Sequence, residues 1–225
     1  MKALIFAAGK GERMRPLTDT CPKALLQVRG MPLIGWHLVA LRAAGIVDIV
    51  INSGWLGEQL PAQLGDGSAF GVNIQWSHEP SEPLETGGGM RRALRLLGDA
   101  PFVATNADIY TDFDYASLPA APTGLAHLVL VDNPQHHPRG DFVLRAGRVH
   151  LCGSERLTFS GIGVYRPELV AHYPEGRYGL APILREAIDF GQVTGEHHRG
   201  RWSDIGTPER LALLNEQAGH AHPRV

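Results

Sequence analysis

Residues 1–23, MKALIFAAGKGERMRPLTDTCPK, decide the fold of this chain. The apolar run 3–8 predicts a buried strand, because it is too short for a helix and ends at a glycine. Gly9 and Gly11 follow directly, and glycines in this position let backbone N–H groups converge on an anion. Four cationic side chains surround the same loop: Lys10, Arg13, Arg15 and Lys23. The pattern predicts a polyphosphate site at the end of the first strand.

Two common phosphate-binding loops do not fit this stretch. A P-loop requires G-x-x-x-x-G-K-[ST], which the sequence does not contain. A dinucleotide fingerprint requires G-x-G-x-x-G, but Met14 stands where the third glycine belongs. The second predicted strand also ends at Asn52, where a nicotinamide-binding fold carries an acidic residue. The alternative to a phosphate site is a purely structural glycine turn whose cationic side chains are solvated.

Strands and helices alternate through the first half of the chain. Strands are expected at 24–28, 48–52, 72–77 and 102–106, and helices at 33–44, 58–64 and 90–97. Such alternation predicts an α/β fold with a Rossmann-like, mixed but mainly parallel sheet sandwiched by helices. Ligands bind at the carboxyl ends of strands in such sheets. Three loops should therefore meet in one cleft: 9–23, 87–89 and 106–108.

The second half of the chain has a different pattern. Strands are expected at 125–131, 142–144, 148–151, 159–165 and 192–197, and helices at 180–190 and 208–217. Ala146 and Gly147 lie between two of these strands and are typical of a hairpin turn. We therefore expect a small, partly antiparallel lobe beside the cleft.

Composition excludes several classes of protein. The formal net charge of the 225 residues is −2, which argues against a general nucleic-acid or membrane surface. Cys21 and Cys152 show no disulfide or metal spacing and predict reduced thiols in a cytoplasmic protein. The apolar run at the N-terminus is too short for a signal peptide or a membrane span.

Two aspartates are candidates for a metal site. Asp108 follows the buried strand 102–106, and Asp204 lies in the string RWSDIGTP. Magnesium on a polyphosphate prefers oxygen ligands and uses one or two carboxylates of the protein. Asp112 and Asp114 are rivals for the first position, although their spacing favours a helix cap. Asp204 could equally cap the helix that begins near Pro208.

The chain resembles the sugar-1-phosphate nucleotidylyltransferases, whose signature is G-x-G-x-R-[ML]-x-P-x-T…P-K. The matching positions are Gly9, Gly11, Arg13, Met14, Pro16, Thr18, Pro22 and Lys23. The family motifs [NG]-x-D and W-x-D-[IV]-G-T-P-E are matched by 106–108 and 202–209. The resemblance covers nearly the whole chain. It implies a nucleotide-diphospho-sugar transferase fold and a Mg2+ ion held by Asp108 and Asp204.

The resemblance also implies roles for single residues. Lys23 and Arg13 are the expected catalytic residues. Contacts to the nucleotide are expected from Ala8, Gly9, Gly11, Glu12, Arg13, Lys23, Gly87 and Gly88, and contacts to the sugar phosphate from Asn106, Gly140 and Glu155. Two local matches are incomplete, since 85–89 departs from the usual G-T-A-G and 154–156 lacks the lysine and proline of E-K-P.

The expected reaction transfers UMP from UTP to N-acetyl-α-muramate 1-phosphate, releases pyrophosphate and serves peptidoglycan recycling. The lactyl carboxylate of this sugar predicts an arginine contact, for which Arg139, Arg156 and Arg201 are candidates. A mannose-1-phosphate guanylyltransferase, a glucose-1-phosphate uridylyltransferase and a non-catalytic sugar-nucleotide sensor are the alternatives.

We expect one nucleotidyltransferase domain over residues 1–217, followed by a flexible tail over 218–225. Its nucleotide-binding half should span about 1–110 and its sugar-binding half about 111–217. UTP and a sugar 1-phosphate are the expected partners, with neither nucleic acid nor membrane. Many relatives carry a further C-terminal repeat domain that has no room here, so we expect a monomer.

Overall fold

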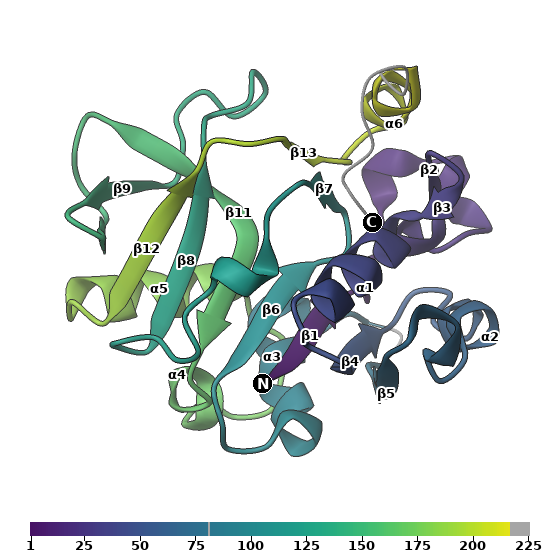
Figure 1. Cartoon of the computed structure of the whole chain (residues 1–225), viewed down its shortest axis with the longest axis horizontal. Coiled ribbons are helices and arrows are strands. Elements are labelled where there is room, and N and C mark those ends of the chain that lie inside the picture. Colours follow the sequence, from purple (N-terminus) through teal and green to yellow (C-terminus); the bar gives the residue numbers. More distant parts are fainter. Residues whose placement is uncertain (81, 217–225) are drawn as a thin grey trace.

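A nine-stranded mixed sheet runs through the centre of the molecule, in the order β5-β4-β1-β6-β11-β8-β12-β10-β9 (Figure 1). The computed structural model describes residues 1–80 and 82–216. The strands of this sheet are β1 (Lys2–Phe6), β4 (Asp48–Ser53), β5 (Asn73–His78), β6 (Phe102–Asn106), β8 (Ala126–Val131), β9 (Phe142–Arg145), β10 (Arg148–His150), β11 (Arg156–Tyr165) and β12 (Val193–His198). Strands from both halves of the chain therefore belong to one sheet.

The predicted parallel arrangement is confirmed for the first half. β1 pairs in parallel with β4, with Ala3 opposite Ile49, and with β6, with Lys2 opposite Phe102. β11 is antiparallel to its neighbours β6 and β8, while β8 and β12 are parallel to each other. β1 thus lies inside the sheet, which explains why its residues form a continuous apolar run.

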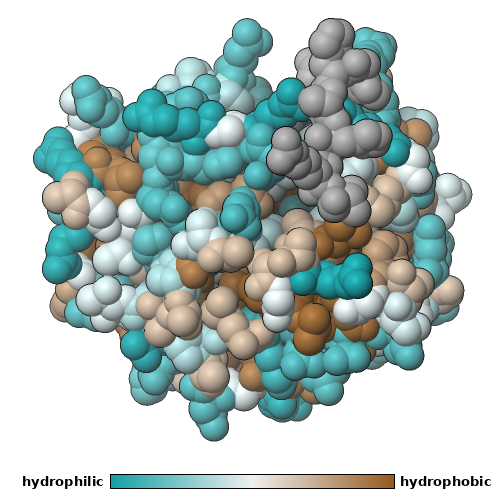
Figure 2. Space-filling model, viewed as in Figure 1, coloured by the Kyte–Doolittle hydropathy of each residue, from teal (hydrophilic) through white to brown (hydrophobic). Residues whose placement is uncertain are grey.

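Helices cover both faces of the sheet (Figure 1). α1 (Leu33–Ala43) lies on one face, and the buried leucines of α2 (Gln59–Leu64) belong to the same hydrophobic cluster. On the other face lie α3 (Glu85–Leu97), α4 (Glu168–Ala171) and α5 (Leu180–Asp189). Ile34, Leu38 and Leu41 of α1 are fully buried. On the face shown in Figure 2, hydrophobic residues gather around α1 and hydrophilic ones lie along the margins. The predicted α/β sandwich is confirmed.

A second, two-stranded sheet lies beside the main one and was not predicted. It pairs β7 (Ile109–Thr111) with β13 (Trp202–Asp204), which leads to α6 (Pro208–Glu216) (Figure 1). A hairpin of β2 (Gln27–Val28) and β3 (Met31–Pro32) packs nearby. Buried side chains from these segments form a separate cluster with the glycine-rich loop: Met14, Leu26, Val28, Leu33, Tyr110, Ile205, Leu211 and Leu214.

The prediction of a loop at 87–89 is wrong, because these glycines lie in the first turns of α3. A Cβ atom at Gly88 would collide with the carbonyl oxygen of Gly176, and one at Gly87 would lie 2.7 Å from the Tyr178 ring. A Cβ atom at Gly89 would lie 2.6 Å from Oε1 of Glu79. The glycines therefore allow close packing of neighbouring segments against α3, and no turn is needed.

The remaining elements mostly follow the sequence predictions. The hairpin between β9 and β10 turns at Ala146 and Gly147, both with positive φ. The short strand expected at 24–28 is partly wrong, since Lys23–Leu25 is a 3-10 turn and only Gln27–Val28 is a strand. Residue 217 and the predicted tail over 218–225 lie outside the described residues. Within the described part of the chain, no helix has the length and apolar character needed to span a membrane.

Candidate active site

A cleft of about 690 Å3 opens where β1, β4 and β6 end. The glycine-rich loop after β1 forms one wall, and another is formed by Glu79, Glu82, Pro83, Glu85 and Thr86. The predicted site residues in its lining are Ala8, Gly9, Gly11, Glu12, Arg13, Lys23, Asn106 and Asp108. Gly206, from the other half of the chain, also lines it. The predicted meeting of loops 9–23 and 106–108 is confirmed.

The glycine-rich loop is folded tightly at Gly11. Gly11 has a φ of 63°, and a Cβ atom there would lie 3.0 Å from Thr18 Cγ2 and 3.3 Å from Lys23 Cβ. Its carbonyl oxygen accepts hydrogen bonds from Met14 N at 2.8 Å and from Thr18 Oγ1 at 2.9 Å. Met14 is fully buried and anchors the loop. This conformation needs glycine and brings Lys23 beside the loop.

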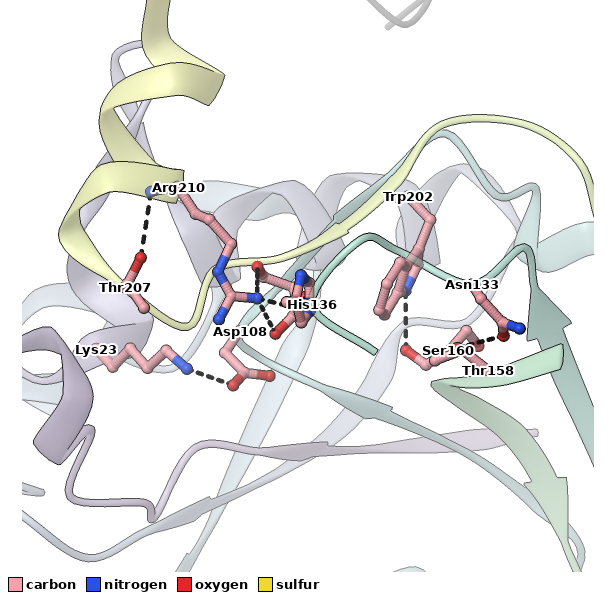
Figure 3. A network of polar contacts seen from close by, with 10 residues as sticks. Lys23, Asp108, Asn133, His136, Thr158, Ser160, Trp202, Thr207 and Arg210 are labelled. Carbon is pink, nitrogen blue, oxygen red and sulfur yellow. Dashed lines mark hydrogen bonds and ion pairs between the residues drawn. The ribbon is translucent and has the colours of Figure 1, made fainter. Parts of the chain in front are cut away.

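Lys23 points from this loop toward Asp108 (Figure 3). Its Nζ lies 2.5 Å from Asp108 Oδ2, and the two side chains are 14% and 37% exposed. Asp108 lies just beyond β6, where Ala107 N donates to the Phe6 carbonyl and continues the ladder between β1 and β6. The sheet therefore fixes the Asp108 backbone, while the carboxylate lies in the cleft.

The small sheet places the backbone of Asp204 next to that of Asp108, although Asp204 itself is not among the residues that line the cleft. In the β7–β13 pair, Asp204 lies opposite Ile109, and Ile205 N donates to the Asp108 carbonyl at 2.8 Å. Two aspartates from distant parts of the sequence are thus held on neighbouring backbones.

Asp204 does not cap α6. Arg210 Nη1 lies 2.6 Å from Asp204 Oδ2, and Arg210 N donates instead to Thr207 Oγ1 (Figure 3). His136 Nε2 lies 2.8 Å from Asp204 Oδ1 and 2.9 Å from Arg210 Nη1. When His136 accepts from the guanidinium, its Nε2 has no proton for Asp204. Asp204 Oδ1 is then a buried acceptor without a hydrogen-bond donor.

These aspartates fit a divalent cation. Their oxygens are the ligand type that Mg2+ prefers. Oδ1 of Asp204, which is buried and lacks a hydrogen-bond donor when His136 accepts from Arg210, is an acceptor that a cation would satisfy. Asp108 and Asp204 would hold such an ion together. No three His, Cys, Asp or Glu side chains of the described residues form a metal-binding group. Substrate oxygens and water would therefore complete the coordination, as is common for magnesium.

Sequence reasoning missed Asn52 and Glu79, which support the wall of the cleft. Asn52, 2% exposed at the end of β4, accepts from Ala7 N and donates to Glu79 Oε1, both at 2.6 Å. Glu79 Oε2 accepts from Leu84 N at 2.7 Å. Burial raises the pKa of the Glu79 carboxyl. The sequence signal that could have identified Asn52 as a site residue is its position, as a polar residue at the end of a buried strand next to β1.

Gly87 and Gly88 do not line the cleft. Glu85 and Thr86 line it at this point. The N–H of Gly88 donates to the Tyr178 carbonyl at 3.0 Å and is not directed at a ligand. The loop from which Gly87 and Gly88 were expected to contact the nucleotide is therefore replaced by the start of α3.

Of the predicted sugar-phosphate contacts, Asn106 lines this cleft, whereas Gly140 and Glu155 do not. Gly140 is buried with a φ of 58°, and Glu155 is exposed between β10 and β11. Arg156 Nη2 donates to the carbonyls of Asp141 and Leu151, which gives this arginine a structural role. Arg201 lines a separate hollow beside Tyr110. Arg139 is exposed.

Comparison with known proteins gives consistent results. An N-acetylmuramate alpha-1-phosphate uridylyltransferase from Neisseria meningitidis serogroup B is 50% identical over 228 residues, covering 97% of this chain and 99% of the relative. A protein of the same name from Caulobacter vibrioides is 33% identical over 223 residues, covering 92% of each chain. The structure of a putative glucose-1-phosphate thymidylyltransferase from Bacillus anthracis superposes with a TM-score of 0.83 at 21% identity, covering 99% of this chain and 96% of that one.

Because the solved structure shares only 21% identity with this chain, its similarity supports the fold and nothing more. The sequence likenesses go further, because residues 2–140 match the family model described as nucleotidyl transferase. The chain therefore belongs to the nucleotidyl transferase family and is a nucleotidyltransferase enzyme.

Proposed function

We propose that this enzyme transfers UMP from UTP to N-acetyl-α-muramate 1-phosphate, giving UDP-N-acetylmuramate and pyrophosphate in peptidoglycan recycling. The meeting of Lys23, Asp108 and Asp204 at one edge of the sheet carries the chemistry. The relative that is 50% identical along nearly its whole length supports the muramyl sugar and the uridine nucleotide.

The reaction is an in-line displacement at phosphorus. A phosphate oxygen of the sugar 1-phosphate attacks the α-phosphorus of UTP, and the bond to pyrophosphate breaks on the opposite side. The attacking phosphate is already anionic near neutral pH, with a second pKa near ~6, so no general base is required. Positioning and charge neutralisation are the remaining tasks of the protein.

Charge repulsion is the main barrier to bringing the substrates together. Like charges ~4 Å apart repel by roughly 4 kcal/mol at an effective dielectric of about 20. Gly11 N–H and Arg13 hold the β- and γ-phosphates, and Lys23 lies between the sugar phosphate and the α-phosphate. Mg2+ held by Asp108 and Asp204 would supply the remaining positive charge.

The base is placed against Ala8 and Gly9 at the end of β1, where the Asn52–Glu79 pair fixes the backbone. Asn106, which lines the cleft at the end of β6, is the proposed contact to the sugar phosphate on this side. Residues of about 1–110 form the nucleotide-binding half and those of about 111–217 the sugar-binding half, where Gly140 and Glu155 are the proposed sugar contacts. The enzyme acts as a cytoplasmic monomer.

The test is pyrophosphate release with Mg2+ and UTP. N-acetylmuramate 1-phosphate is compared with N-acetylglucosamine 1-phosphate and glucose 1-phosphate, and GTP with mannose 1-phosphate is run in parallel. We expect strong release with the muramyl sugar and UTP, and its loss when EDTA removes the metal. Release with another pair would keep the chemistry and overturn the proposed substrate. No release with any pair would favour a sugar-nucleotide sensor.

A further inference from the structure

Arg210 is a cationic side chain that no part of the proposed reaction uses. It projects from the first turn of α6 toward the metal-binding aspartates (Figure 3). Its Nη1 lies 2.6 Å from Asp204 Oδ2 and 3.3 Å from the Asp204 carbonyl. The two side chains are 19% and 24% exposed, so this ion pair is partly shielded from solvent. Arg210 is held in the site and is not a loose surface charge.

Asp204 is paired with Arg210 and Asp108 with Lys23, so these side chains carry no net charge together. If both aspartates bind a divalent cation, the same group gains two positive charges. A phosphate monoester carries about −1.5 to −2 at pH 7. The gained charge would therefore attract the sugar 1-phosphate, in addition to the UTP phosphates that Gly11, Arg13 and Lys23 are proposed to hold.

The position of Arg210 suits this phosphate. The cations of the glycine-rich loop come from the nucleotide half, and Arg210 comes from the other half, beside Gly206, which lines the cleft. A Cβ atom at Gly206 would lie 2.5 Å from Arg210 Nη2 and 3.2 Å from Asp204 Oδ2. Glycine at this position thus leaves space for the guanidinium next to the cleft wall. A guanidinium also matches phosphate oxygens in a bidentate manner.

We propose that Arg210 has two alternating partners, namely Asp204 in the metal-free site and the phosphate of the sugar 1-phosphate once Asp204 binds a metal ion. This inference rests on the proposed function for the identity of the phosphate. It makes Arg210 a competitor of the metal and a contact of the second substrate. A residue that only oriented Asp204 would instead strengthen metal binding.

The test compares Arg210→Met and Arg210→Lys with the surface control Arg95→Met. Arg95 lies on α3, is not among the residues that line the cleft, and pairs with the exposed Glu175. Binding of Mn2+ alone is measured by electron paramagnetic resonance, without substrates. KM for UTP and for N-acetylmuramate 1-phosphate is then measured by pyrophosphate release.

We expect Arg210→Met to bind Mn2+ at least about threefold more tightly, because Asp204 loses a competing cation. Its KM for the sugar phosphate should rise roughly 10–100-fold, while its KM for UTP changes less than about threefold. Arg210→Lys should keep nearly wild-type Mn2+ affinity with a smaller rise in sugar KM, and Arg95→Met should match the wild type in both.

Weaker Mn2+ binding by Arg210→Met, or an unchanged KM for the sugar phosphate, would overturn the inference. If Arg210→Met does not fold, as judged by circular dichroism, the sugar KM of Arg210→Lys decides. Failure of the proposed function has a different signature, since the wild type itself would then release no pyrophosphate with the muramyl sugar. The Mn2+ measurement does not depend on that activity.

Discussion

Lys23 ends the glycine-rich loop, and its Nζ lies 2.5 Å from Asp108 Oδ2, one of the two proposed metal ligands. Replacing it with alanine removes a contact to charge that develops between the phosphates, and loss of such a contact typically lowers turnover about 10²–10³-fold. Asp108 is 37% exposed, so water can solvate its carboxylate after the replacement. We therefore expect Lys23→Ala to fold and to lose turnover at saturating substrates.

Pyrophosphate release measures this loss, and thermal unfolding controls for the fold. A correctly folded Lys23→Ala enzyme with wild-type turnover would remove Lys23 from the mechanism.

His37 links α1 to the strand beside Asp108. Its Nε2 donates to the Ile109 carbonyl at 2.8 Å, so Nδ1 is the acceptor facing Tyr115 Oη at 2.9 Å. Complete burial lowers the pKa of His37 from 6.5 to about 4. The unfolded chain therefore binds this proton first, and stability falls as the pH drops from about 6.5 to 4. The full loss is on the order of 3 kcal/mol.

Urea unfolding of the wild type and of His37→Phe, at several pH values from 7.5 to 4, tests this contribution. The variant should be less stable at pH 7.5, because Ile109 and Tyr115 lose their partner. The difference between the two proteins should shrink toward pH 4. A difference that stays constant with pH would show that His37 is not the titrating group.

The sequence predicted the residues that follow a strand or belong to a motif, and it missed those that depend on contacts between distant segments. Lys23, Asp108 and Asp204 belong to the first kind. Arg210 and His136 belong to the second, because no local pattern links residue 136 to residues 204 and 210. Glu155 was chosen from an incomplete motif, and the structure leaves it exposed and outside the lining of the cleft.

Among the helices, α3 shows how packing overrides local preference. Three successive glycines predict a loop, yet Gly88 lies in a helix against the Gly176 carbonyl. Gly88→Ala should destabilise the protein by about 1–3 kcal/mol, because backbone atoms must move. The melting temperature should fall roughly 2–4 °C for each kcal/mol in a chain of this size.

Gly179→Ala is the matched control for Gly88→Ala. A Cβ atom there would lie 3.4 Å from its nearest neighbour, an ordinary contact, and its φ is negative. We expect it to change the melting temperature much less, as measured by calorimetry. Equal losses in both variants would argue against the packing explanation.

The long strands could be predicted because burial leaves a clear apolar run, as in β1 and β6. β7 and β13 could not, since each has three residues and is stabilised by its partner across the chain. These short strands nevertheless place Asp204 beside Asp108. The alternation of strands and helices gave the α/β class correctly, whereas the place of β11 between β6 and β8 depends on tertiary pairing.

Ligand binding should stabilise the folded protein, because both halves of the chain contribute to the cleft. UTP with Mg2+ at about 100 times its Kd should add about 2.7 kcal/mol. The melting temperature should then rise by roughly 5–10 °C. UTP with EDTA should give a smaller rise, measured by scanning fluorimetry.

Asp204→Asn separates the two contributions. This variant should keep the rise seen with UTP and EDTA and lose most of the extra rise with Mg2+. A full magnesium effect in Asp204→Asn would exclude Asp204 as a metal ligand.

The central position of β1 also affects how the chain folds during synthesis. Residues 2–6 are made before both of their neighbours in the sheet, which are β4 and β6, and β6 ends at Asn106. Ribosomes add roughly 5–20 residues per second, so this apolar segment waits about 5–20 s for its second neighbour. Pairing over such sequence distances is also intrinsically slow. This segment therefore needs protection from aggregation until β6 is available, by chaperones or by slow expression at low temperature.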